Sequence, residues 1–170
     1  HFLVANPAFN TELVHITMEG SILPVCVVLG VLAGVLGVLF SKTIFFFNGV
    51  YSKIRVPNYL KPALAGFLTG LAGLFLPYIL SSGNGSVEML FKGELPIVLV
   101  CTIFCVKFII TPLCFGSGAA GGIFLPMLML GSFLGYITGF GANLLGAEVN
   151  LVAISSLGMA GFLASVSRTP

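Results

Sequence analysis

The sequence reads GSGAAGGIFLP at residues 116–126, between two long apolar segments. Four of the first seven residues in this stretch are glycine, which disfavours a stable helix. If the neighbouring segments cross a membrane, the break falls at membrane depth. Irregular backbone is tolerated there only where it is buried in protein or lines a cavity. The stretch therefore predicts a broken helix inside a helical membrane protein.

A long apolar helix is expected to begin directly after the break, and Pro126 suits its first turn. The backbone N–H groups of Gly122, Ile123 and Phe124 would then point away from the helix start. Together with the positive end of the helix dipole, they form a place where an anion can bind. Neutral donors can hold a partly dehydrated anion without trapping it, as conduction requires. The alternative is a glycine-rich loop that only lets two helices pack, and the residues leave both open.

The composition of the whole chain points to lipid as its solvent. Hydrophobic residues make up 58% and charged residues only 7%, whereas a soluble domain has about 25% charged residues. The net charge of +2, with no long basic run, gives no indication of a nucleic-acid partner. We also expect an internal piece of a longer protein, because the chain starts at His1 and stops directly after an apolar segment.

The hydropathy pattern divides the chain into an aqueous loop at 1–21, following an earlier helix, and a transmembrane region at 22–170. A spanning helix needs about 20 apolar residues. The apolar segments expected within the region are 22–41, 63–80, 95–115, 123–145 and a shorter one at 151–166. The loop at 42–61 contains four basic residues and no acidic one, which places it on the cytoplasmic side by the positive-inside rule.

Glycines recur at four-residue spacing along several of these segments. Such spacing lets helix backbones approach closely in a membrane. The instances are Gly30 with Gly34, Gly66 with Gly70, and the stripe of Gly131, Gly135 and Gly139. They predict tight helix packing and carry no information about a substrate.

The ionisable residues argue against an enzyme, because no set of acid/base, nucleophilic or metal-binding groups converges within the spans. The chain has no Asp, its two histidines lie in the N-terminal loop, and its five glutamates fall in loops or at segment ends. We predict no catalytic residue, no metal site and no cofactor. The four cysteines are interpreted as small apolar residues in helix packing. Lys107 alone is a charged residue inside a span, which raises a functional role, but we favour a side chain that reaches a nearby membrane interface.

The motif Ser117-Gly118-x-x-Gly121-Gly122-Ile123-Phe124-x-Pro126 resembles the GxFxP-containing signature of CLC chloride channels and transporters. Lys107, Thr111 and Gly131 are similar to the family's residues around that motif, and the resemblance covers essentially the whole chain. One departure is Ala120, where a proline is usual. The resemblance implies an all-α membrane protein, a CLC-type bundle of tilted and broken helices, of which this chain is part of the second inverted repeat.

The same resemblance implies that a chloride ion is bound by the backbone amides of Ile123 and Phe124, with Gly122 as a further candidate. It implies a homodimer in a lipid bilayer with one anion pathway per subunit. The gating and proton-transfer glutamates of the family are expected outside this chain, and none of its own five glutamates receives either role.

The function expected from these observations is transmembrane transport of chloride or a similar anion, as a proton-coupled exchanger in a bacterial inner membrane. Alternatives are a passive chloride channel of the same family and an unrelated secondary transporter that uses the same broken helix. A membrane-embedded enzyme or a structural subunit is the least favoured interpretation.

Overall fold

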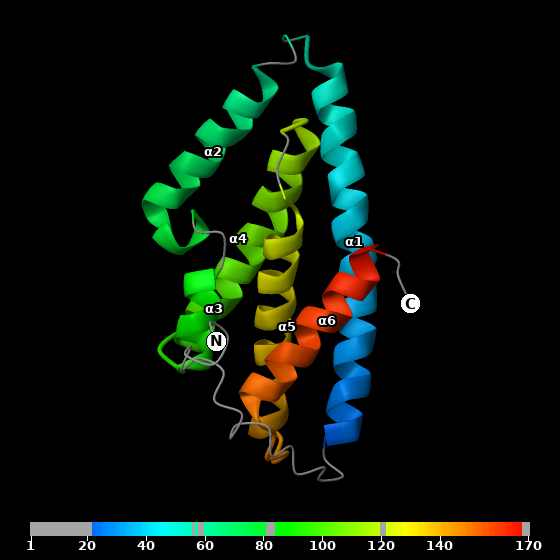
Figure 1. The fold of residues 1–170 in the computed structure, drawn as a ribbon, viewed down its shortest axis with the longest axis vertical. Coiled ribbons are helices and arrows are strands. Elements are labelled where there is room, and N and C mark those ends of the chain that lie inside the picture. The colour runs from blue at the N-terminus through cyan, green and yellow to red at the C-terminus, as the bar shows by residue number, and fades with distance from the viewer. Residues whose placement is uncertain (1–21, 56, 58–59, 81–83, 120–121, 168–170) are drawn as a thin grey trace, which may run out of the picture.

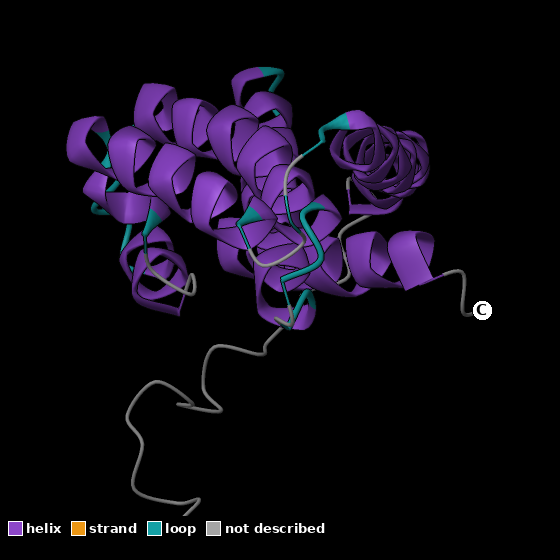
Figure 2. Cartoon of the chain, turned by 90° about the horizontal axis from the view of Figure 1, so that it is seen from above, coloured by secondary structure: helices purple, strands orange, loops and turns teal. Residues whose placement is uncertain are grey.

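The computed structural model describes residues 22–55, 57, 60–80, 84–119 and 122–167. Within these ranges all regular structure is helical, as Figure 2 shows. The elements are α1 (Ile22–Lys53), α2 (Lys61–Phe75), the short 3-10 helix η3 (Pro77–Ile79), α3 (Asn84–Phe91), α4 (Ile97–Gly116), α5 (Phe124–Leu144) and α6 (Leu151–Ser167). Helices α4 and α5 pack against each other and against α1, and α6 crosses α5 and α1 (Figure 1). The predicted loop at 1–21 lies outside the described residues.

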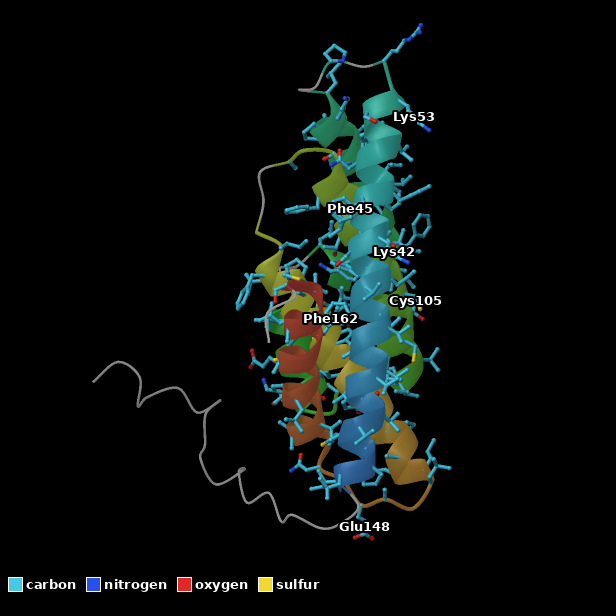
Figure 3. The ribbon with its side chains drawn as sticks, turned by 90° about the vertical axis from the view of Figure 1, so that its right-hand side faces the viewer. Lys42, Phe45, Lys53, Cys105, Glu148 and Phe162 are labelled. Atoms are coloured by element: carbon cyan, nitrogen blue, oxygen red, sulfur yellow. The ribbon has the colours of Figure 1, made fainter. Side chains whose placement is uncertain are left out.

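Helix α1 is longer than the sequence predicted. It does not end at Ser41 but continues for 32 residues to Lys53, so the predicted loop at 42–61 is helical over its first 12 residues. Lys42, Phe45 and Lys53 all lie on this one helix (Figure 3). The predicted apolar segment stops before Lys42, but the residues after Lys42 are rich in phenylalanine and include no proline before Pro57. At 1.5 Å per residue the helix is about 48 Å long, longer than the hydrocarbon core of about 30 Å.

The second predicted span, at 63–80, is not a single helix. Helix α2 has 15 residues, too few for a perpendicular crossing that needs about 20. It ends at Phe75 because Pro77 disfavours the helical conformation at Leu76, whose φ and ψ are −137° and 83°. Three described helices, α1, α4 and α5, are long and apolar enough to cross a membrane. The short fifth segment is confirmed as α6, with 17 residues.

The glycine stripe on α5 lies at its crossing with α6, as predicted. A Cβ atom on Gly131 would overlap the carbonyl oxygen of Gly158, and one on Gly135 would overlap that of Ile154. Within the described helices an added Cβ at Gly30, Gly34, Gly66 or Gly70 would meet no atom within 4 Å, so the close backbone approach predicted for these two pairs is not found there. Gly34 nevertheless contacts α6, because the hydroxyl of Ser165 donates to its carbonyl at 3.3 Å.

An aromatic cluster fixes α4 and α6 against α1. The ring of Phe40 on α1 is fully buried, and its centroid lies 5.4 Å from that of Phe108 and 5.7 Å from that of Phe162. Both contacts are edge-on, the arrangement that aromatic quadrupoles favour. Because α4 is held in this way, the position of its C-terminal end, where the glycine-rich break begins, is also fixed.

Candidate functional site

Helix α5 begins as the sequence predicted, directly after the break. Ile123 is the N-cap residue, Phe124 is the first helical residue and Pro126 lies in the first turn. The N–H of Met127 donates to the carbonyl of Ile123 at 3.1 Å. The N–H groups that precede Met127 have no partner four residues earlier within the helix. No side chain caps this helix start.

Two glycines of the break have distinct structural roles. Gly116 is the last residue of α4 and packs against the part of α1 that follows Ser41. An added Cβ on Gly116 would lie 2.8 Å from the Cβ of Phe47 and 2.9 Å from the backbone nitrogen of Asn48. Gly118 has a φ of +84°, a conformation that side chains disfavour. The hydroxyl of Ser117 donates to the carbonyl of Cys114 at 2.6 Å, so this motif residue caps the C-terminal end of α4. Gly121 of the motif lies outside the described residues.

A cavity of about 230 Å³ adjoins the start of α5. It lies between α2, η3, α4 and the first residues of α5. Its lining is mainly apolar with a few polar side chains, as is usual for binding sites. The lining residues are Thr69, Ile79, Leu80, Lys107, Ile110, Thr111, Cys114, Phe115, Ala119, Gly122, Ile123 and Pro126. Three residues of the predicted site, Gly122, Ile123 and Pro126, therefore share one cavity, whereas Phe124 is absent from its lining and its side chain is 54% exposed.

Lys107 lies in the middle of α4 and only 7% of it is exposed. The interpretation that its side chain reaches a membrane interface is wrong, because a side chain at an interface contacts water and this one is buried against the cavity. A sequence shows which helix carries a lysine but not which helices surround it. The residues that line the cavity with Lys107 include Thr69 from α2, Ile79 from η3 and residues at the start of α5.

The contact between α2 and α4 beside the cavity was not predicted. The hydroxyl of Thr69 lies 2.9 Å from the Cys114 sulfur and also donates to the carbonyl of Ala65 at 2.9 Å. These residues are 45 positions apart, and neither belongs to a sequence motif. No local signal in the sequence could have paired them.

Thr69→Val should weaken the fold slightly by removing this contact between helices. Thr43→Val is the matched control, because Thr43 makes the same backbone bond, to Leu39, from the exposed side of α1. We expect Thr69→Val to lower the free energy of unfolding by about 0.5–1 kcal/mol more than the control does. Thermal unfolding followed by circular dichroism measures this difference, and equal shifts would show that the contact adds nothing.

Helix α3 carries an exposed ion pair outside this cavity. The ammonium of Lys92 lies 2.8 Å from the carboxylate of Glu88, one turn earlier on α3. This hydrogen bond and the charge of Lys92 lower the pKa of Glu88, but both side chains are exposed and the pair adds little stability. Within the described ranges, no group of three His, Cys, Asp or Glu side chains could hold a metal ion.

Comparison with known proteins agrees with the fold and the motif. Residues 1–170 match the family model described as voltage gated chloride channel. The chain belongs to this CLC family. The resemblance of the motif at 117–126 to the CLC signature is thereby confirmed, and so are the expected all-helical fold and the membrane location of the chain.

Several curated proteins of the CLC family are similar to this chain, and each is named H(+)/Cl(-) exchange transporter ClcA. The protein from Vibrio campbellii is 35% identical over 150 residues, which cover 84% of this chain and 32% of the relative. One from Klebsiella pneumoniae is 35% identical over 149 residues, covering 84% and 32%. One from Vibrio cholerae is 33% identical over 158 residues, covering 89% and 34%. The chain thus spans about a third of the length of these relatives.

Proposed function

We propose that this chain takes part in the transport of chloride or a similar small anion across a membrane, and that the start of α5 holds the anion. The observation that carries the proposal is that residues at the N-terminal end of α5 line the cavity. Ile123 and Gly122 line the cavity at the end of α5 where the helix dipole is positive. Membership of the CLC family agrees with a chloride substrate.

The backbone amides of Ile123 and Phe124, with that of Gly122, are the proposed ligands of the anion. Amide donors at a helix start are neutral and fixed in place, so they stabilise an anion without forming a tight ion pair. Weak binding of this kind allows the anion to leave again, which transport requires. This mechanism uses hydrogen bonds and dipoles and no covalent chemistry, so the protein acts as a transporter and not as an enzyme.

Proton-coupled exchange is the proposed mode of transport, with a passive channel as the alternative. The similar curated proteins are named H(+)/Cl(-) exchange transporters. None of the described residues that line the cavity is acidic. For this reason we assign the proton path to no residue of this chain.

The proposed setting is a homodimer in a bacterial inner membrane, with the link between α1 and α2 in the cytoplasm. This link follows Lys53 at the end of α1, contains Arg55 and precedes Lys61 at the start of α2. Basic residues beside spanning helices remain on the cytoplasmic side. The large apolar side chains exposed along α1, such as Phe45 at 70%, suit contact with lipid or with another part of the assembly.

A flux measurement tests this function. The intact protein is reconstituted into liposomes loaded with chloride, and chloride efflux and external pH are recorded together. We expect chloride efflux accompanied by proton movement against the proton gradient. Chloride efflux without proton coupling would make the protein a channel, and a folded sample that moves no chloride would contradict the proposed function.

A further inference from the structure

We infer that one exposed face of α1 binds an anionic phospholipid, with an acyl chain in a groove at residues 31–39 and the headgroup phosphate at Lys42. This face lies outside the cavity at the start of α5, so the inference does not depend on the proposed anion site. The lipid belongs to the leaflet on the side of the link between α1 and α2.

A groove on the surface of α1 carries the first step of the argument. It is shallow, with a volume of about 570 Å³. Its lining residues are Val31, Gly34, Val35, Val38, Leu39 and Lys42. The aliphatic side chains of this lining are exposed, with Val35 at 63%, and an added Cβ at Gly34 would meet no atom within 4 Å. Because the lining is aliphatic except at Lys42, the groove suits a hydrocarbon chain with a negative charge at one end.

The residues of this face follow one another along a single side of α1. The three valines of the groove and Lys42 are separated by four, three and four residues, the spacing of one side of an α-helix. Phe45 and Phe46 follow one turn later and are 70% and 65% exposed. The face therefore changes along the helix from aliphatic to basic and then to aromatic.

The position of Lys42 along α1 matches the level of a lipid headgroup. The residues from Ile22 to Ser41 rise about 30 Å at 1.5 Å per residue, which equals the thickness of the hydrocarbon core. With Ile22 at one boundary of the core, Lys42 lies at the other boundary. A lysine at this level can extend its ammonium to a phosphate while its methylene groups stay in contact with apolar atoms.

The charge at this end of the molecule favours an anionic lipid. Residues 22–61 include four basic residues and no acidic one. Lys53, beyond the groove, lies at the opposite end of the molecule from Glu148 (Figure 3). Basic residues beside a spanning helix attract anionic headgroups, whereas a zwitterionic headgroup has no net charge to attract. A protein helix in the groove would explain the valines but not the basic residue at their end.

The test counts lipids bound to the intact protein by native mass spectrometry in an uncharged detergent. Phosphatidylglycerol is the anionic probe, and phosphatidylcholine with the same acyl chains is the zwitterionic one. We expect the original protein to bind phosphatidylglycerol more tightly. Lys42→Gln should weaken phosphatidylglycerol binding about fivefold and leave phosphatidylcholine binding unchanged. Lys92→Gln is the matched control, because Lys92 is exposed on α3 and paired with Glu88, and it should change neither affinity.

Gly34→Leu tests the groove separately from the charge. The added side chain starts in open space and fills part of the groove, so the variant should fold. We expect it to weaken the binding of both lipids by the same factor, about threefold or more, and to keep the preference for phosphatidylglycerol.

The inference is overturned if the original protein binds the two lipids equally, or if Lys42→Gln binds phosphatidylglycerol as tightly as the original protein. Normal binding of both lipids by Gly34→Leu would also overturn it, because no acyl chain would then lie in the groove. A Gly34→Leu variant that fails to fold would place a protein helix there instead. None of these results changes the chloride flux that tests the proposed function.

Discussion

Ile123→Pro should lower the affinity of the protein for chloride about tenfold or more. A hydrogen bond to a charged group contributes about 1.5–3 kcal/mol, and about 1.4 kcal/mol corresponds to a factor of ten. Proline removes the N–H of Ile123 and fits the position, because the φ of −84° is near the range that proline requires. The residue before it is Gly122, which has no Cβ to clash with the proline ring.

The matched control for this substitution is Ile123→Val, which trims the same side chain and keeps the amide. We expect it to bind chloride as the original protein does. Titration of chloride into each purified variant gives the two dissociation constants. Equal chloride dissociation constants for the two variants would show that the amide of Ile123 does not bind the anion.

Gly158→Ala should destabilise the protein strongly, because α5 and α6 touch through their backbones at this point. A Cβ on Gly158 would overlap the carbonyl oxygen of Gly131 and lie 2.9 Å from the Cα of Gly135. Backbone atoms cannot rotate away as a side chain can, so the two helices must separate. We expect a loss of about 1–3 kcal/mol in the free energy of unfolding. Adding Gly131→Ala to the same protein should prevent folding.

Gly70→Ala on α2 is the control for this prediction. An added Cβ there meets no atom within 4 Å, and alanine is a better helix former than glycine by about 1 kcal/mol. The control should be as stable as the original protein or slightly more so. Thermal unfolding measures both variants, and equal melting temperatures would contradict the close crossing of α5 and α6.

The elements with strong local signals were predictable from the sequence. The start of α5 directly after the glycine-rich stretch follows from the glycines and Pro126. The end of α2 at Phe75 was missed, because the predicted segment at 63–80 runs through Pro77. The end of α1 was not predictable in this way. Lys42 interrupts the apolar run without breaking the helix, because lysine is a good helix former.

Features that depend on distant parts of the chain could not be predicted. The spacing of Gly30 and Gly34 is the same as that of Gly131 and Gly135, yet in the described bundle only the second pair faces another helix backbone. The cavity that Lys107 lines is likewise formed with residues from α2, η3 and α5, which are distant from it in the sequence. The motif indicated Ile123 correctly as a residue at the helix start, but it did not show that Phe124 is 54% exposed and absent from the cavity lining.

Bromide diffraction tests the central claim most directly. Bromide replaces chloride in crystals of the intact protein, and its anomalous signal marks the position of the anion. We predict an anomalous peak beside the backbone nitrogens of Ile123 and Phe124, within the cavity that Lys107 lines. Anomalous density found only elsewhere, or none in a protein that transports bromide, would contradict an anion site at the start of α5.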